Sequence, residues 1–380
     1  MQRFNIFGTG TLALALTLIS ANLQGATFNV SNGSELQTAL TTAQSNGEGD
    51  TILLAPGTYD ASGATFTYVA DNSLGSEENF PLTLQGSDAA TTLLDGGDAN
   101  QVMVLDASPI PDDSNADIRI ENLTFQNANA TTFGAGLLVI TNNADVTLLG
   151  SQFLNNETTN FGAGADLQLG AHGGSGNLVA NGNLFAGNVA NDIGAAEFIV
   201  DGGSAVISNN IFFNNQSVGN TGAVIVQYFS GVPAGGPMTL VNNTFFQNTS
   251  GTDIGALYLA ADLSGEVLNV YNNIIFGNSA GTTSQDIFAD LGAGAVLNLF
   301  NNDFSEICFD AVNCDPALNA SVNLGANLNV DPLLVDPTGG DFSLGLGSPV
   351  IDQGDPNAPD LPALDYLGNP RIAGAAPDMG

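Results

Sequence analysis

The sequence predicts an all-β protein, a right-handed parallel β-helix made of three-strand coils of about 30 residues. Asparagine pairs followed by apolar or aromatic residues recur along the chain, as in "NNTFFQNTS" (242–250) and "NNIFFNNQS" (209–217). A Gly-Ala step with alternating apolar residues lies between these copies, and a third apolar segment precedes each pair. Successive markers lie 27 to 33 residues apart, as given by Asn122, Gly150, Asn183, Asn210, Asn243, Asn273 and Asn302. Such a period indicates stacked coils with loops of unequal length.

The N-terminus is typical of a secretory signal. Arg3 precedes an apolar run over residues 12–21, which is followed by small residues. A lone membrane-spanning helix is the alternative, but the run is shorter than the ~20 residues that span a bilayer. We therefore expect a signal peptide over residues 1–25, an exported chain without a transmembrane segment, and a β-helix over residues 26–329.

A short helix is expected to cover the N-terminal end of the stack, because an open end would expose strand edges. The stretch "SELQTALTTAQ" offers Ser34 and Gln37 as a capping box. Apolar residues follow at helical spacing, at Leu36, Ala39, Leu40 and Ala43.

The asparagine motif predicts architecture. Asparagine tolerates left-handed φ at a sharp bend, and a side-chain amide stacked on its neighbour extends the hydrogen-bonded ladder. We expect such a ladder at Asn122, Asn183, Asn210, Asn243 and Asn273. We expect an apolar column facing inward at Phe125, Phe153, Phe185, Phe213, Phe246 and Phe276.

The charge of the chain excludes several classes of partner. The formal net charge is -35, with 38 acidic residues against three arginines and no lysine. Nucleic acid and anionic lipid are held by clustered Lys and Arg, so neither is an expected partner. An extracellular glycan or an envelope component remains, and we expect the protein to be a monomer.

The two cysteines, Cys308 and Cys314, are predicted to form a disulfide, because export places them in an oxidising compartment. A zinc site is the alternative. Two thiols without a nearby histidine make a poor zinc cage, so the disulfide is favoured.

The C-terminal part carries the most specific motifs of the chain. "VDPLLVDPTGGDFSLGLGSPVIDQGD" and "DYLGNPRI", together with "DTILLAPGTYD" near the N-terminus, resemble the bacterial right-handed β-helix surface proteins of the choice-of-anchor Q type. The resemblance covers nearly the whole mature chain and implies export and display at the cell envelope. We expect residues 330–380 to be a Pro/Gly-rich C-terminal cap, with the natural chain continuing beyond it into an anchor.

The residue types argue against a polysaccharide lyase, which on this fold uses Lys or Arg as base and clamp. A glycoside hydrolase needs only two carboxylates. Candidates for it are Asp166, the sole histidine His172, and Asp192, with Glu197 close in sequence. The alternative for His172 is a polar loop residue beside two glycines.

Calcium is the remaining chemical option, because it accepts oxygen ligands in flexible geometry. A row of oxygen-bearing side chains precedes the Gly-Ala steps and includes Thr132, Asn160, Asp192, Asn220 and Asp253. Asp192 and Asp253 are its candidate calcium ligands, and turn capping explains the row equally well. No other cofactor is expected.

The sequence therefore predicts a secreted or surface-displayed scaffold, adhesin-like or carbohydrate-binding, without catalysis. Sugars would stack on outward-facing aromatic rings, for which Tyr228 and Tyr258 are candidates. An extracellular carbohydrate-active enzyme, a hydrolase rather than a lyase, is the alternative.

Overall fold

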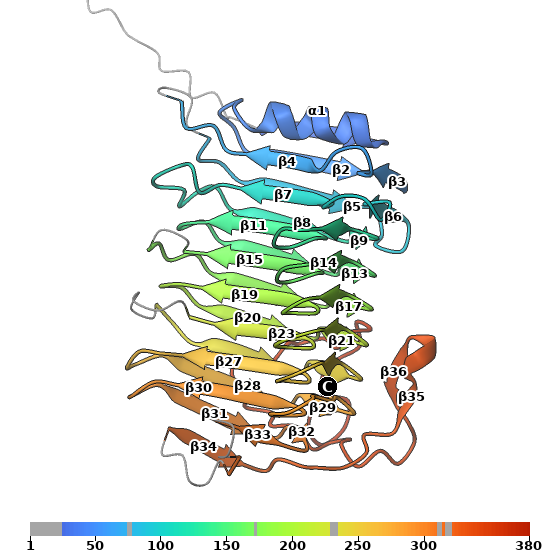
Figure 1. Ribbon diagram of the computed structural model, residues 1–380, viewed down its shortest axis with the longest axis vertical. Coiled ribbons are helices and arrows are strands. Elements are labelled where there is room, and N and C mark those ends of the chain that lie inside the picture. The colour runs from blue at the N-terminus through green and yellow to red at the C-terminus, as the bar shows by residue number, and fades with distance from the viewer. Residues whose placement is uncertain (1–24, 74–77, 171–172, 229–234, 310–313, 316–320) are drawn as a thin grey trace, which may run out of the picture.

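The computed structural model describes residues 25–380 except 74–77, 171–172, 229–234, 310–313 and 316–320. Over these residues the chain is a right-handed parallel β-helix of about eight turns, stacked along one axis (Figure 1). The predicted fold class is confirmed. The predicted signal peptide and His172 lie outside the described residues.

Three long parallel sheets run along the stack. Sheet A contains β1 (Thr27–Val30), β2 (Asp50–Leu54), β5 (Leu82–Gly86), β8 (Ile118–Glu121), β12 (Val146–Leu149), β16 (Leu178–Asn181), β20 (Ala205–Ser208), β24 (Met238–Val241), β28 (Val267–Tyr271), β31 (Val296–Phe300) and β34 (Val322–Gly325). Sheet B contains β3 (Gly57–Asp60), β6 (Thr92–Asp95), β9 (Thr124–Gln126), β13 (Gln152–Leu154), β17 (Leu184–Ala186), β21 (Ile211–Phe213), β25 (Thr244–Phe246), β29 (Ile274–Phe276) and β32 (Asp303–Phe304). Sheet C contains β4 (Phe66–Val69), β7 (Met103–Asp106), β11 (Leu137–Thr141), β15 (Ala165–Leu169), β19 (Ala196–Val200), β23 (Val224–Gln227), β27 (Leu257–Ala261), β30 (Ile287–Leu291) and β33 (Ile307–Cys308).

Two smaller sheets complete the fold. The middle coils add a short strand between sheets B and C, and these form a parallel sheet of β10 (Asn129–Ala130), β14 (Glu157–Thr158), β18 (Val189–Ala190), β22 (Gln216–Ser217) and β26 (Thr249–Ser250). Near the C-terminus, β35 (Leu334–Asp336) and β36 (Asp341–Leu344) pair antiparallel around a 3-10 turn, Pro337–Gly339.

At the corner between sheets A and B, two consecutive residues have different roles: the first turns the chain and the second bonds to the next coil. The first has left-handed φ, between 53° and 69°, and is Asn122, Gly150, Gly182, Asn209, Asn242, Asn272 or Asn301. The second faces inward and forms a ladder of Ser151, Asn183, Asn210, Asn243, Asn273, Asn302 and Asn327, of which all but the terminal Asn327 are buried. The ladder prediction was therefore wrong by one residue at Asn122. This residue belongs to the series of first residues with left-handed φ, which we call the left-handed column.

A second ladder of the same kind lies at the far end of sheet B, at Asn156, Asn188, Asn215, Asn248 and Asn278. Within both ladders the amide nitrogens donate to a backbone carbonyl and to the amide oxygen of the next coil, as Asn188 does to Phe153 and Asn215. At the end of the second ladder, Asn278 donates to the carboxylate of Asp286 in place of a next amide. A side chain thus supplies the hydrogen bonds that the backbone loses at the bend.

The strand register corrects the predicted aromatic column. Fully buried rings stack at centroid distances of 4.6 to 5.1 Å through Phe125, Phe153, Phe185, Phe212 and Phe245. Phe213, Phe246 and Phe276 follow the inward residues by one position, so they lie on the outer side of sheet B and form a second, wider stack. Since strand side chains alternate, a shift of one residue reverses their direction. The error arose where two large apolar residues are adjacent, as in Phe212-Phe213 and Ile275-Phe276.

The N-terminal helix α1 (Gly33–Ala43) lies across the end of the stack (Figure 1). Its four predicted apolar residues are buried. The predicted cap was wrong, because the N-cap is Asn32, whose side chain accepts a hydrogen bond from the backbone nitrogen of Glu35. The Glu35 carboxylate in turn accepts from the backbone nitrogen of Ser31.

The C-terminal segment, residues 330–380, does more than cap the last coil. After β34 the chain crosses the end of the stack and then continues along the flank, where the β35–β36 hairpin stands beside sheet B (Figure 1). Val350 and Met379 of this segment are buried against Ile274 of the β-helix. A second, small apolar cluster therefore fixes the segment to the outside of the coils.

Two further features complete the description. A disulfide joins Cys308, the last residue of β33, to Cys314. Across the described ranges, no helix is long and apolar enough to span a membrane.

Candidate functional site

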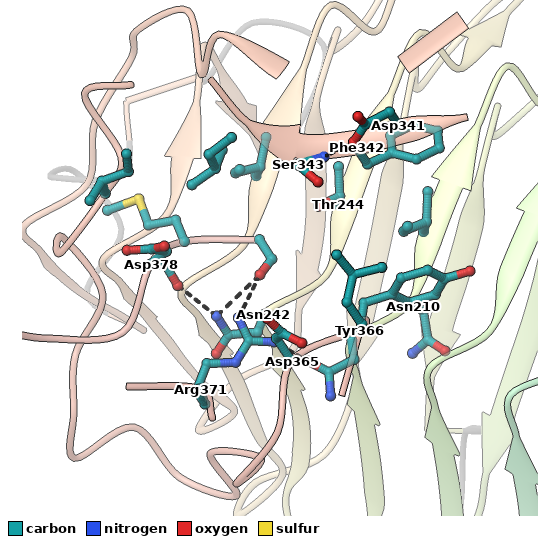
Figure 2. A pocket seen from close by; sticks show the side chains of 18 of the residues that line it. Asn210, Asn242, Thr244, Asp341, Phe342, Ser343, Asp365, Tyr366, Arg371 and Asp378 are labelled. Carbon is teal, nitrogen blue, oxygen red and sulfur yellow. Dashed lines mark hydrogen bonds between the residues drawn. The ribbon is translucent and has the colours of Figure 1, made fainter. Parts of the chain in front are cut away.

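A pocket of about 290 Å³ lies between the C-terminal segment and the β-helix (Figure 2). Its floor comes from the corner between sheets A and B and from β25, with Asn210, Asn242 and Thr244. Its walls come from the C-terminal segment, with Tyr366 and Arg371 among them. The site thus exists only where the segment is docked.

The outward asparagines of the left-handed column hold the segment in place. Asn209, Asn242, Asn272 and Asn301 donate their side-chain amides to backbone carbonyls of residues 353–378 at 2.8 to 3.2 Å. The carbonyl of Asn272 also accepts from the backbone nitrogen of Gly380 at 2.7 Å. Under the segment the column is entirely asparagine, whereas the two preceding coils have Gly150 and Gly182.

Arg371 is the one cationic side chain that lines the pocket. It is only 8% exposed. Its Nη1 donates to the carbonyl of Gly380 at 2.9 Å, and its Nη2 donates to the side-chain oxygen of Asn209. Its Nε is buried without a partner among the described residues. Burial lowers the pKa of the guanidinium, and the charges of Asp365 and Asp378 oppose that shift.

Two aromatic residues of the segment also line the pocket. Phe342 of β36 meets the outer ring of Phe213 edge to face, with centroids 5.4 Å apart. Tyr366 retains 39% exposure, and its ring lies above Asn210 in Figure 2. Burial raises the pKa of the Tyr366 hydroxyl, so the side chain is a neutral ring with a polar tip.

Three carboxylates line the pocket, and each accepts hydrogen bonds from backbone amides. Asp341 accepts from the nitrogen of Ser343, and hydrogen bonds from Ser343 lower the pKa of this carboxyl group. Asp365 accepts from the nitrogen of Asn369, and Asp378 accepts from that of Asp352. Backbone donors favour the ionised form of a carboxyl group. The three carboxylates thus present hydrogen-bond acceptors to the pocket.

The predicted catalytic carboxylates lie elsewhere, on sheet C. Asp166 of β15 is directly paired with Glu197 of β19 and is fully buried. Burial, followed by the charge of Glu197, raises the pKa of Asp166 well above its ordinary value. Burial also raises the pKa of Glu197, to about 7, and the charge of Asp192 adds to that rise.

Their position argues against hydrolysis at this pair. Adjacent strands lie about 4.8 Å apart, which excludes inversion, because inversion requires carboxyl groups roughly 6.5 to 9.5 Å apart with a water between them. Retention requires only about 5 to 5.5 Å, so against a retaining mechanism it is burial that argues. Asp166 has no exposed surface for a substrate to reach. The Glu197 carboxylate accepts a hydrogen bond from Gln227 of the next coil at 3.1 Å. We therefore interpret Asp166 and Glu197 as a structural pair.

The predicted oxygen-rich row exists as a geometric feature. Bridges between Ile193, Thr221 and Ile254 place Asp192 and Asp253, which precede them, along the same edge. The Asp253 carboxylate already accepts from the hydroxyls of nearby threonines. Among the described residues, one group of three metal-ligand side chains lies within 4.8 Å, namely Glu306, Cys308 and Cys314, and it contains the disulfide. Calcium at Asp192 and Asp253 stays a prediction.

One of the predicted sugar-stacking rings is in the core. Tyr228 is 3% exposed and donates to the carbonyls of Gly236 and Val267, so it cannot contact a ligand. Tyr258 lies on the outer side of sheet C, where it stacks on Phe288 at 5.7 Å.

Comparison with known proteins finds only distant likeness. No protein-family model matches the chain. No curated protein matches it in sequence. Among solved structures, pectate lyase Pel9A is similar at 14% identity, with 90% of this chain and 89% of that chain covered and a TM-score of 0.39. The PL6 family alginate lyase AlyGC is 15% identical over 85% of this chain and 57% of its own, with a TM-score of 0.25.

A mannuronic acid specific family 6 lyase from human gut microbiota is 11% identical over 80% of this chain and 83% of its own, with a TM-score of 0.23. The parallel β-helix follows from the strand pairing of the chain itself, and its likeness to pectate lyase is distant.

The pocket was not predicted from the sequence. Asn209, Asn242, Arg371 and Tyr366 carry it, and none was predicted as a site residue. The available signal was the doubling of asparagine from residue 209 onward, where Gly182 precedes Asn183 in an earlier coil. At these corners the first asparagine of the pair bonds the C-terminal segment and the second bonds the inward ladder.

Proposed function

We propose that this protein is exported and displayed at the cell envelope, where it acts as a non-catalytic β-helix scaffold that binds a glycan. The resemblance of its C-terminal motifs to the choice-of-anchor Q type supports the place of action. The pocket under the C-terminal segment supports glycan binding, because it combines aromatic rings, amides and carboxylates in one concave site.

The proposal that the protein is not catalytic rests on the two arginines of the described chain, both of which already have partners within the protein. Arg119 forms an ion pair with Glu121, on the same strand of sheet A. Arg371 is fixed by Gly380 and Asn209 beneath the C-terminal segment. Without a lysine in the sequence, neither a base nor a clamp is free for uronate chemistry.

A glycan array with the purified secreted protein tests binding, and product assays test catalysis. We expect retention of one or a few glycans, no unsaturated product from pectin or alginate at any calcium level, and no release of reducing ends. Reducing ends that disappear in Asp166→Asn would establish the hydrolase alternative. An array without any bound glycan would refute the binding function.

A further inference from the structure

The pocket offers a buried hydrogen-bond donor that the protein itself does not use. Arg371 is more than nine-tenths buried, and its Nε has no acceptor among the described residues, although the other two guanidinium nitrogens do. A buried polar group without a partner is energetically costly. Nε is closed off from solvent beside the pocket, so a ligand acceptor reaches it through a small shift of the docked C-terminal segment and then removes that cost.

The charges around Arg371 decide which acceptor fits. Asp341, Asp365 and Asp378 line the same pocket. One guanidinium against three carboxylates leaves the pocket acidic, and the whole chain has a net charge of -35. An anionic sugar would meet repulsion both on approach and in the site. A neutral hydroxyl can accept from Nε and donate to a carboxylate.

The apolar part of the pocket matches the other side of a sugar. Tyr366 presents a neutral, partly exposed ring, and Phe342 is held edge-on by Phe213. Sugar rings have an apolar face of C–H groups, which packs on aromatic rings in the same way as other apolar groups do. A volume of about 290 Å³ lies at the small end of ligand pockets, which suits one sugar unit rather than an extended chain.

We infer that this pocket binds a neutral sugar unit, such as the end of a glycan chain, with hydroxyl groups between Arg371 and the aspartates and with the ring against Tyr366. This inference rests on the proposed glycan binding and adds the site and the class of sugar. The walls belong to the docked C-terminal segment, so a bound sugar also holds that segment against the coils.

The test measures binding of neutral methyl hexosides and of the corresponding uronic acids by saturation-transfer NMR and calorimetry, with the full secreted chain. We expect neutral hexosides to bind and uronic acids to bind at least about tenfold more weakly. Loss of the ring in Tyr366→Ala should weaken binding by about tenfold, whereas Tyr366→Phe should keep most of it.

Two controls separate the site from the fold. Ile372→Ala changes an exposed residue of the same segment, and Phe133→Ala removes an exposed ring from another coil. Both should bind within about twofold of the wild type. Hydrogen exchange of the wild type gives an independent readout, because a bound sugar should slow exchange in residues 361–371.

Each remaining outcome overturns the inference. Tighter binding of uronic acids would refute the neutral class. Unchanged binding in Tyr366→Ala, or protection that maps to the Tyr258 surface, would refute the site while leaving glycan binding intact. If the array and these titrations are both negative, the proposed function fails together with the inference.

Discussion

Replacement of Asn243 by alanine should be among the most destabilising single changes in this protein. Its Oδ1 accepts from the backbone nitrogen and the side-chain amide of Asn210, at 2.9 and 3.0 Å. Its Nδ2 donates to the carbonyl of Ile207 at 2.8 Å and to Asn273 Oδ1 at 3.0 Å. Alanine would leave two buried backbone groups without a hydrogen-bond partner, each at a cost of about 1 to 3 kcal/mol. We therefore expect the free energy of unfolding to fall by about 4 kcal/mol.

Urea unfolding followed by far-ultraviolet circular dichroism measures this loss, and hydrogen exchange locates it. The amide of Asn210 should lose protection, because its acceptor is the Asn243 side chain. The matched control is Asn122→Gly, which keeps the left-handed corner and has no ladder partner to lose, so its stability should stay within about 0.5 kcal/mol of wild type. A change of that small size in Asn243→Ala, with residue 210 still protected, would refute the structural role of the ladder.

Three further changes test other parts of the structure. Phe212→Ala should lower the free energy of unfolding by about 3 to 5 kcal/mol, as expected for a buried ring, whereas Phe213→Ala should lower it by only about 1 kcal/mol. Equal losses in urea unfolding would contradict the strand register. Because burial raises the pKa of Glu197 to about 7 from 4.5, the folded state holds a proton that the unfolded chain releases. The free energy of unfolding should therefore fall as the pH rises from 4.5 to 7, by roughly 1 kcal/mol per pH unit at most. Glu197→Gln should flatten the dependence of the melting temperature on pH. An unchanged slope in this variant would show that Glu197 is not the group that titrates. Replacing Cys308 and Cys314 by serine should cost on the order of 2 kcal/mol, with increased hydrogen exchange confined to the last coil, and a uniform loss along the stack would count against a local role.

Much of the fold could be predicted, because each coil repeats the same local problem. The period of the Asn/Phe motif indicates the coil length, and the apolar positions of α1 show which side of it faces the stack. Predictions failed where two equivalent residues are adjacent, as at Phe212 and Phe213, since sequence patterns give the spacing of side chains but not which of two neighbours starts the alternation.

The site was less predictable than the fold. Asp166 and Glu197 were candidates because they are carboxylates in the right coils, and only their direct pairing on β15 and β19 indicates that they pack against each other. Arg371 was not among the predicted site residues. Asn209, which holds its Nη2, lies 162 residues away in the sequence, and no local pattern connects the two.

The sequence by itself determined the parallel β-helix and the asparagine ladders in general form; that partners which need basic residues do not bind stays a prediction. These properties depend on composition and on repeats, in which every coil contributes the same short-range preferences. Only the tertiary structure decided which asparagines face outward, that residues 330–380 dock on them, and that a pocket with a buried Arg371 forms between the two. The physical reason is that docking of the segment depends on contacts between residues far apart in the chain, which occur once and leave no period to detect.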